Sequence, residues 1–179
     1  MGGGNFNDAA GSKLMTGFPW RVGQGVDVHR FAEGDHVMLC GVSIPHDRGV
    51  LAHSDGDVAL HALCDALLGA LALGDIGKHF PDTDERWKGA HSRDLLRQVV
   101  SLVHERGFVV GNVDMTLLAE RPRISPWIAR MQAVVAEDLA VDSDAVSIKA
   151  TTTEKLGYVG REEGLMAMAV VLLARHSCS

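Results

Sequence analysis

The sequence lacks the features that mark membrane-spanning and secreted chains. No apolar run reaches the ~18–20 residues needed to span a bilayer. The nearest, residues 58–74, is interrupted by His61 and Asp65. Residues 1–20 are rich in glycine and contain no apolar segment behind basic residues, so we expect no secretory signal there. We expect residues 1–20 to form a flexible extension and residues 21–179 to form a single domain.

Cysteine and positive charge are also scarce. The three cysteines, Cys40, Cys64 and Cys178, have no CxxC spacing, which is typical of free thiols in a reducing cytoplasm. The net charge of -6 argues against a nucleic-acid-binding surface, although a locally basic site can still bind a small anion. Hydrophobic residues make up 46% of the chain, enough for a buried core. We therefore expect a cytoplasmic protein without nucleic-acid or membrane partners.

Strand and helix patterns alternate along the chain. We expect strands at residues 21–29, 37–44, 108–119, 146–151 and 164–174, and helices at residues 57–73, 91–107 and 125–139. Asp57 is a suitable N-cap and Gly74 a suitable stop for the first helix. Residues 164–174 are apolar on both faces, which predicts a central strand or one whose second face meets another subunit. The predicted fold class is α/β (α+β), a two-layer domain with a mixed sheet covered by helices.

Two short segments carry side chains typical of metal ligands. Asp27 and His29 are two positions apart on an expected strand, so their side chains point to one face. His61 lies one turn after Asp57 in an apolar helix. One carboxylate and two imidazoles suit a catalytic zinc ion with an open fourth position, or a non-haem iron. The alternatives are a surface pair at a strand end and a hydrogen-bonded core histidine.

Two further segments suit recognition of a phosphate or a sugar. His53 and Ser54 precede the helix, where free backbone N–H groups favour an anion. The alternative is that Ser54 or Asp55 simply caps the helix. Residues 75–77 and 80–84 are acidic and rich in turn formers, which fits either local turns or recognition of sugar hydroxyls.

A run of three threonines begins a candidate phosphate loop at residues 150–161. Lys155 and Arg161 add positive charge there, and Glu154 is a candidate ligand for a hard cation such as magnesium. The segment matches no P-loop spacing, and threonine also favours strands.

Four stretches together resemble the 2-C-methyl-D-erythritol 2,4-cyclodiphosphate synthase family: GVDVHRF, LAHSDGDVALHALCDALLGALALGDIGKHFPDTD, GNVDMTLLAERPRI and KATTTEKLGYVGR. The resemblance extends from about residue 21 to residue 174. It implies a phosphorus-oxygen lyase of the non-mevalonate isoprenoid pathway that forms the 2,4-cyclodiphosphate from 4-diphosphocytidyl-2-C-methyl-D-erythritol 2-phosphate and releases CMP. It also implies a homotrimer with an active site between neighbouring subunits.

The resemblance assigns roles to individual residues. Asp27, His29 and His61 match the zinc ligands, and Glu154 matches the ligand of a second cation, Mg2+ or Mn2+. His53 and Thr152 match positions that stabilise the transition state. Residues 75–77 and 80–84 match contacts to the ribose and the methylerythritol, and residues 119–125 and 151–153 match the cytidine pocket and its phosphate contacts. The implied substrate contacts are Asp27, Val28, His29, His53, Ser54, Asp75, Ile76, Gly77, Phe80, Pro81, Asp82, Thr83, Asp84, Ala119, Glu120, Arg121, Pro122, Arg123, Ile124, Ser125, Thr151, Thr152, Thr153, Glu154, Tyr158 and Arg161.

The implied chemistry explains why no obvious nucleophile or general base is present. The substrate's own 2-phosphate attacks the β-phosphorus of its diphosphate, so positioning and electrostatics dominate. Two departures from the family pattern are the N-terminal extension and Arg123, where a lysine is often found. Two other hypotheses remain: a non-haem iron oxygenase, which leaves TTTEK and the acidic loops unexplained, and a metal-stabilised binding protein without catalysis.

Overall fold

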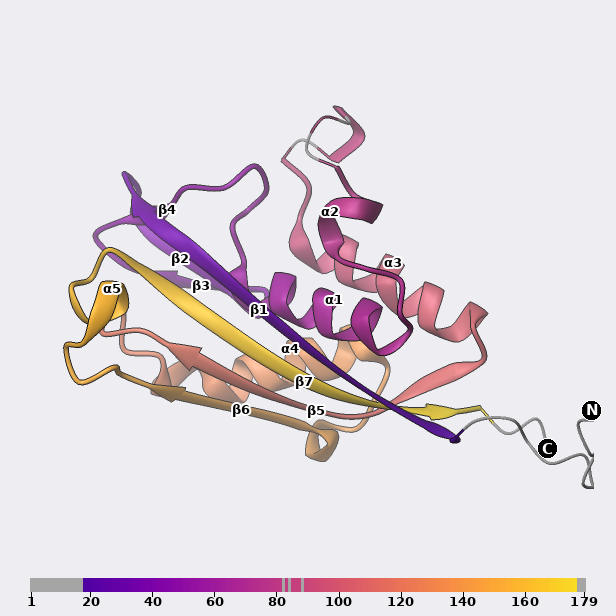
Figure 1. Cartoon of the computed structure of the whole chain (residues 1–179). Coiled ribbons are helices and arrows are strands. Elements are labelled where there is room, and N and C mark those ends of the chain that lie inside the picture. The colour runs from indigo at the N-terminus through magenta and orange to yellow at the C-terminus, as the bar shows by residue number, and fades with distance from the viewer. Residues whose placement is uncertain (1–17, 82, 84, 88, 177–179) are drawn as a thin grey trace, which may run out of the picture.

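A mixed sheet with the strand order β4-β1-β7-β5-β6 forms the centre of the computed structural model (Figure 1). The structure describes residues 18–176, apart from positions 82, 84 and 88. The strands are β1 (Trp20–Ala32), β4 (Gly49–Val50), β5 (Phe108–Leu118), β6 (Val146–Thr151) and β7 (Gly164–Arg175). β7 pairs antiparallel with both β1 and β5, while β6 runs parallel to β5. The predicted α/β fold with a mixed sheet is confirmed, and β7 is central, as its apolar sequence predicted.

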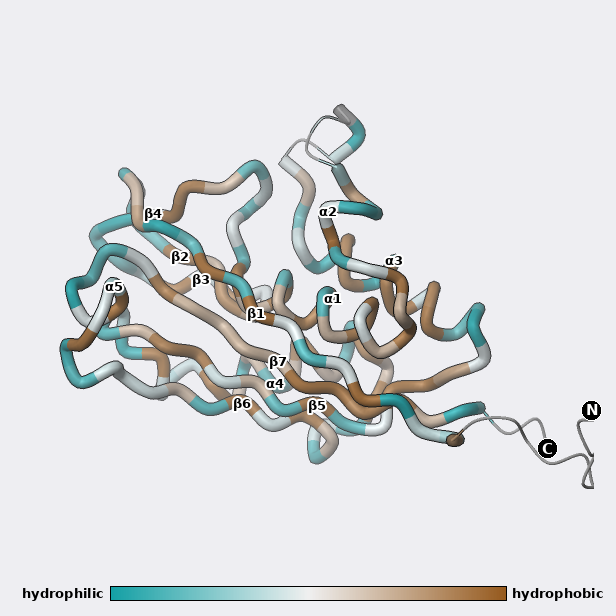
Figure 2. Tube along the Cα trace, viewed as in Figure 1, coloured by the Kyte–Doolittle hydropathy of each residue, from teal (hydrophilic) through white to brown (hydrophobic). Residues whose placement is uncertain are grey.

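The long helices lie on one face of this sheet. α1 (Val58–Ala70) packs across β1 and β7, α3 (Ser92–Glu105) packs against α1, and α4 (Ile128–Leu139) packs against β6. β7 is hydrophobic over most of its length (Figure 2). Its alternate residues, Leu165, Ala167, Ala169, Val171 and Leu173, are buried in the core beneath the helices.

The opposite face of the sheet is apolar and partly exposed. Val22, Val26, Val28 and Val170 are 68%, 43%, 47% and 43% exposed. The long helices α1, α3 and α4 pack on the other face and leave these valines partly exposed. The other possibility predicted for residues 164–174 was a strand whose second face meets another subunit. These exposed valines form a candidate surface for that contact.

Short elements connect the larger ones. These are the hairpin β2 (His36–Leu39) and β3 (Val42–Pro45), the single-turn helices α2 (Ile76–His79) and α5 (Gly157–Gly160), and 3-10 turns at Glu85–Trp87, Ser125–Trp127 and Ser143–Ala145. None of the helices in the described ranges combines the length and the apolar character that a bilayer span requires.

The prediction of one strand at residues 37–44 is wrong. The chain reverses at Cys40 and Gly41, where φ is 50° and 72°, and forms the antiparallel pair β2 and β3. The buried carboxylate of Asp57 accepts the N–H groups of both turn residues, at 2.9 Å from Cys40 and 2.6 Å from Gly41. The turn is therefore stabilised by a residue distant in sequence. Cysteine is not a residue type that predicts a turn, so the sequence alone did not indicate this reversal.

The three predicted helices are confirmed with shorter bounds. Asp57 caps α1 by accepting the N–H of Leu60 at 3.0 Å. α1 ends at Ala70 rather than at residue 73, because the chain turns through left-handed conformations at Ala72 and Gly74 (φ 56° and 94°). The first turn of the helix expected at residues 125–139 is a 3-10 turn, and α4 begins at Ile128.

The termini and the acidic segment also differ from expectation. Residues 1–17 of the predicted flexible extension lie outside the described residues, and Trp20 already belongs to β1. Residues 75–84, expected to be loops, include the helix α2.

Candidate active site

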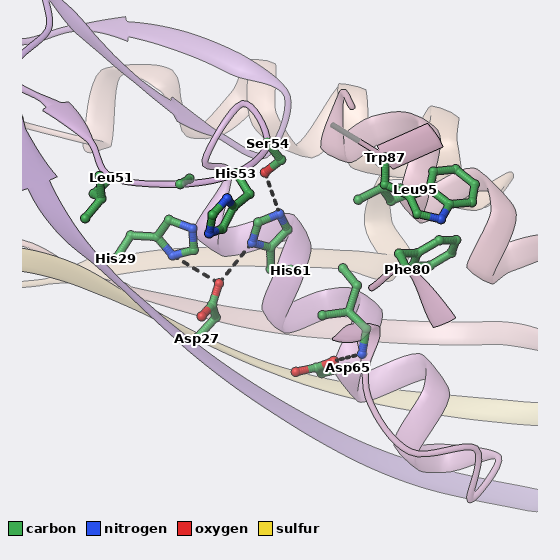
Figure 3. A pocket seen from close by; sticks show the side chains of 12 residues that line it. Asp27, His29, Leu51, His53, Ser54, His61, Asp65, Phe80, Trp87 and Leu95 are labelled. Carbon is green, nitrogen blue, oxygen red and sulfur yellow. Dashed lines mark hydrogen bonds and ion pairs between the residues drawn. The ribbon is translucent and has the colours of Figure 1, made fainter. Parts of the chain in front are cut away.

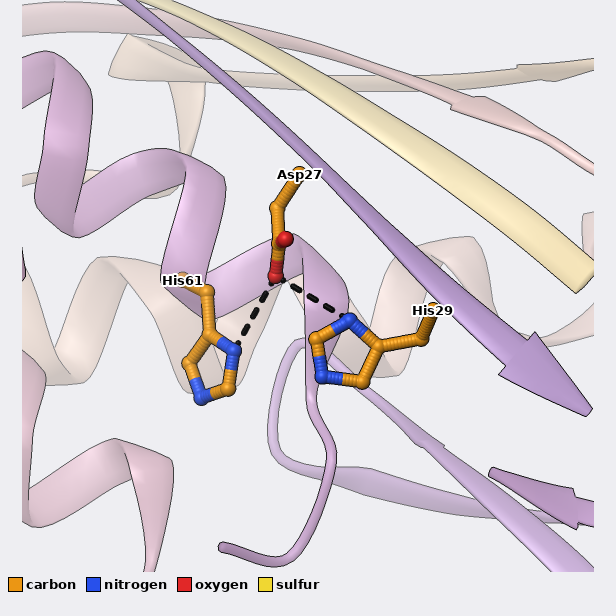
Figure 4. Close-up of side chains that lie close together, drawn as sticks. All are labelled: Asp27, His29 and His61. Carbon is orange, nitrogen blue, oxygen red and sulfur yellow. Dashed lines mark hydrogen bonds and ion pairs between the residues drawn. The ribbon is translucent and has the colours of Figure 1, made fainter. Parts of the chain in front are cut away.

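Asp27, His29 and His61 lie together beside the N-terminal end of α1 (Figure 4). Asp27 and His29 project from β1, and His61 lies in the first turn of α1. The Nδ1 atoms of both histidines are 3.1 Å from Oδ2 of Asp27. One ligand atom from each residue lies within 4.8 Å of the other two. The structure thus brings together the three residues that the sequence analysis grouped.

These three residues fit a divalent metal ion. The side chains of His29, His61 and Asp27 are 10%, 14% and 26% exposed, so the cluster is largely removed from water. Nδ1 of His29 is buried and, despite its 3.1 Å contact with Asp27, has no well-oriented hydrogen-bond partner among the described residues. A buried polar atom in that position favours a ligand. Two imidazole nitrogens and a carboxylate oxygen are the donor set of three-ligand zinc sites.

The electrostatics of the cluster favour a cation. Burial raises the pKa of Asp27, but the neighbouring imidazoles of His29 and His61 outweigh burial and hold that pKa well below its usual range. Burial lowers the pKa of His61, but the surrounding carboxylates, above all that of Asp27, outweigh burial and raise it. Both shifts favour positive charge beside Asp27, which a metal ion can supply in place of protons.

A cavity of about 330 Å³ opens beside the cluster (Figure 3). Phe80 and Trp87 pack edge to face, 4.9 Å between ring centroids, and form an apolar wall away from the histidines. Apolar walls with a few convergent polar groups are typical of small-molecule sites. The lining residues are Asp27, His29, Leu51, Ala52, His53, Ser54, His61, Asp65, Ile76, Phe80, Trp87 and Leu95.

His53 and Ser54 line this cavity, and neither caps the helix. The N-cap is Asp57, whose side-chain and main-chain oxygens accept the N–H groups of Leu60 and His61. Oγ of Ser54 lies 3.2 Å from Nε2 of His61. The N–H groups expected to attract an anion are therefore largely taken by Asp57, and an anion in the cavity would meet side chains instead.

Asp75 stabilises the short helix α2. Its carboxylate accepts the N–H of Lys78 at 2.9 Å and caps α2. The next N–H, of Ile76, donates to Asp65 at 2.7 Å. These two contacts hold the short helix beside the cavity.

The rest of the acidic segment is only partly in the cavity. Ile76 and Phe80 line it, whereas the other described positions, Gly77, Pro81 and Thr83, do not. Two further predicted contacts, Asp82 and Asp84, lie outside the described residues. Recognition of sugar hydroxyls by this segment stays a prediction.

Most of the residues predicted to bind cytidine line a separate cavity of about 340 Å³. The parallel strands β5 and β6 end side by side, with Leu118 paired to Thr151, so the loops that follow them meet. The lining residues are Ala119, Glu120, Pro122, Arg123, Ile124, Ser125, Ala150, Thr151 and Thr152, and the Arg121–Pro122 bond nearby is cis. This cavity shares no lining residue with the cavity beside Asp27.

Glu120 organises the threonine loop. Its carboxylate accepts the backbone N–H groups of Thr153 and Lys155, at 3.0 and 3.3 Å, and the hydroxyl of Thr153 at 3.3 Å. The hydroxyl of Thr152 donates to Glu154 at 3.2 Å, and the Glu154 side chain is exposed. Neither Thr152 nor Glu154 lines the cavity beside Asp27 in the same chain.

The remaining predicted contacts lie at a third cavity or on the surface. Tyr158 donates to the sulfur of Met166 at 3.3 Å and lines a cavity of about 400 Å³ with Val28. His29 borders both this cavity and the one beside Asp27. Arg161 is exposed and forms an ion pair with Glu163 at 2.6 Å.

Sequence reasoning assigned no role in the site to three polar residues near the cluster. Asp65 lines the cavity, and its position one helical turn after His61 was a usable signal. Asp55 and Ser92 bond each other and lie beside His61, but they are 37 residues apart and no local pattern links them.

Three comparisons identify the family. The YgbB family matches residues 20–174. A protein named 2-C-methyl-D-erythritol 2,4-cyclodiphosphate synthase from Stutzerimonas stutzeri is 64% identical over 155 residues, covering 87% of this chain and 99% of the relative. A protein of the same name from Azotobacter vinelandii is 66% identical over 153 residues, covering 86% and 98%. The solved structure of IspF from Plasmodium falciparum as a CDP complex is 33% identical, with a TM-score of 0.78, and covers 90% of this chain and 100% of that one. The chain therefore belongs to the YgbB family, the family of 2-C-methyl-D-erythritol 2,4-cyclodiphosphate synthases.

Proposed function

We propose that this chain converts 4-diphosphocytidyl-2-C-methyl-D-erythritol 2-phosphate into 2-C-methyl-D-erythritol 2,4-cyclodiphosphate and releases CMP. It is a phosphorus-oxygen lyase of non-mevalonate isoprenoid synthesis. The observation that carries the proposal is the Asp27–His29–His61 cluster beside a cavity, in a chain 64% identical to a named synthase over most of its length. The CDP in the related Plasmodium structure supports a CDP-linked substrate.

The reaction needs positioning rather than covalent catalysis by the protein. An oxygen of the 2-phosphate attacks the β-phosphorus, and the bond from that phosphorus to the oxygen of the CMP leaving group breaks. Because both groups belong to one substrate, a cavity that holds them together makes the step intramolecular. His53, which lines the cavity, and Thr152 are the proposed donors to charge that develops in the transition state.

Two cation sites belong to this proposal. Asp27, His29 and His61 would hold zinc, and Glu154 would hold a second divalent cation, magnesium or manganese. Bound there, the cations would supply positive charge that polarises the phosphates and neutralises the leaving group. Glu154 is a single exposed carboxylate, which suits magnesium, because that ion keeps waters and substrate phosphates as its other ligands.

A homotrimer would bring the separate parts of the site together. Within one chain, the cluster and the threonine loop line different cavities. The uncovered sheet face, with Val22, Val26, Val28 and Val170 exposed, is the kind of apolar surface that protein interfaces bury. We propose one domain per chain, residues 21–179, three chains packed through this face, and active sites between neighbouring subunits.

The other substrate contacts follow the same arrangement. Residues 75–77 and 80–84 would bind the ribose and the methylerythritol beside the zinc ligands. Residues 119–125 and 151–153 would bind the cytidine and its phosphates across the interface, with Tyr158 and Arg161 nearby. A cytoplasmic location remains a prediction of the sequence.

CMP release from the purified substrate, with and without a chelator, tests the reaction. We expect turnover that the chelator stops and that His61→Ala abolishes together with zinc binding, while the fold persists. The matched control is His104→Ala, an exposed histidine on α3, which should turn over normally. Full zinc occupancy in His61→Ala would contradict the ligand assignment. Bound iron with oxygen consumption would instead support the oxygenase.

Two further measurements test the second cation and the assembly. Glu154→Gln keeps the side-chain size but removes the charge. Because Glu154 is not one of the proposed zinc ligands, zinc content should be unchanged, while the rate of CMP release should fall by ~10²–10³-fold. If Glu154→Gln turned over at the wild-type rate at every magnesium concentration, Glu154 would not hold the second cation. Light scattering should give about three times the 19.2 kDa chain mass, and a monomer at micromolar concentration would count against the trimer.

A further inference from the structure

Ser92 links the carboxylate of Asp55 to Nε2 of His61, the ring nitrogen that faces away from Asp27. It is the first residue of α3 and is fully buried. Its Oγ lies 3.0 Å from Nε2 of His61 and 2.5 Å from Oδ1 of Asp55. Its backbone N–H donates to the other oxygen of Asp55 at 3.2 Å. The line Asp55–Ser92–His61 ends at the ring nitrogen that faces away from Asp27.

The direction of these hydrogen bonds follows from the donors available. A carboxylate that already accepts a backbone N–H is an acceptor, so the Ser92 hydroxyl donates to Asp55. The hydroxyl has one proton, and its lone pairs then face Nε2 of His61. Nε2 must therefore carry a proton and donate it to Ser92. Metal binding requires the neutral ring, and in that ring Nδ1 then keeps its lone pair and faces the oxygen of Asp27 at 3.1 Å.

Ser54 does not change this assignment. Its hydroxyl oxygen also lies 3.2 Å from Nε2 of His61 and accepts the N–H of Gly56 at 3.2 Å. If Nε2 were bare and took a proton from Ser54, its lone pair would face that of Ser92 at 3.0 Å. The locked Ser92 hydroxyl thus decides which tautomer fits.

We propose that Asp55 and Ser92 are positioning residues that fix the metal-binding tautomer and ring orientation of His61. The proposal rests on zinc at the Asp27–His29–His61 cluster, and it does not depend on the reaction catalysed there. A ligating imidazole that donates its other N–H to a fixed acceptor is a better ligand, and loss of such a partner typically weakens metal binding by ~10–100-fold. Here the acceptor is a serine that a carboxylate orients.

Zinc affinity of the full chain, measured by competition with a chromophoric chelator, tests the proposal. Ser92→Ala and Asp55→Asn should each weaken zinc binding by ~10–100-fold. The double variant should be no weaker than Ser92→Ala, because both changes act through one hydrogen bond. The control is Ser101→Ala on the same helix, where the hydroxyl donates to the backbone oxygen of Arg97, and its zinc affinity should be unchanged.

Proton NMR of the zinc-loaded chain adds a readout that a general loss of stability would not move. The wild type should show a solvent-protected imidazole N–H signal from Nε2 of His61, and Ser92→Ala should lose that protection. Zinc affinity within twofold of wild type in Ser92→Ala, or losses that add in the double variant, would overturn the proposal. A wild type that binds no zinc would overturn both this inference and the metal site. Zinc binding without CMP release would overturn the reaction alone.

Discussion

Replacing Asp57 with alanine should remove about 3 kcal/mol from the free energy of unfolding. Asp57 is fully buried, and its Oδ1 accepts the N–H groups of Cys40 and Leu60 at 2.9 and 3.0 Å. Loss of the helix cap at Leu60 costs about 1 kcal/mol. The buried N–H of Cys40, left without an acceptor, costs about 1–3 kcal/mol more. Gly41 is part-exposed, so water can replace the contact from its N–H to Oδ2 of Asp57. Removing the buried charge also recovers part of the cost of burying it, so the total stays at about 3 kcal/mol.

Urea unfolding at a fixed protein concentration measures this loss. With a slope of about 2 kcal/mol per molar urea, the midpoint should fall by about 1.5 M. Asp75→Ala is the matched control, since Asp75 is exposed and caps α2 through one N–H; it should cost at most about 1 kcal/mol. Asp57→Ser keeps a cap for Leu60 but not the hairpin contacts, so it should recover about 1 kcal/mol. If Asp57→Ala cost no more than Asp75→Ala, the anchoring role of this carboxylate would be refuted.

Two other predictions follow from the packing of α1 and its surroundings. In Gly25→Ala, the new Cβ would lie 1.9 Å from the backbone oxygen of Ala62, so α1 must shift; we expect a loss of about 3 kcal/mol in urea unfolding and reduced zinc content. In Gly69→Ala on α1, the nearest atom outside the local helix backbone would lie 3.7 Å from the new Cβ, so this variant should not destabilise the chain. Equal losses in both variants would contradict the steric argument. Burial raises the pKa of the Cys40 and Cys64 thiols, so neither should be alkylated in the native chain; mass spectrometry that finds either one modified before denaturant is added would show the packing to be wrong.

The parts of the fold that the sequence predicted correctly are those marked by a local hydrophobic pattern. Alternation located β5 and β6, a run that is apolar on both faces located β7, and an apolar run behind a capping aspartate located α1. The Asp27–His29 pair was visible because residues two apart on a strand share a face. His61 could be added because its helix began at Asp57.

The parts that could not be predicted depend on contacts between distant residues. Nothing local marks Cys40 as a turn residue, because its left-handed conformation is stabilised by Asp57, seventeen positions later. The short helix α2 was expected to be a loop, and its docking depends on the bond from Ile76 to Asp65 of α1. The bond from Ser92 to His61 joins two helices that only tertiary packing brings together. Residue type alone cannot reveal such pairs.

The alternation of β1 explains why the candidate metal site lies where it does. Gly23, Gly25, Asp27 and His29 occupy successive positions on the face that meets α1. At the first two positions a Cβ would lie 1.9 Å from a helix backbone oxygen, so only glycine permits the close approach of strand and helix. At the next two positions, near the helix N-terminus, side chains have room and are ligands. The glycines therefore let α1 pack close enough to β1 for His61 to contact Asp27. The same strand provides both the close packing and two residues of the candidate site.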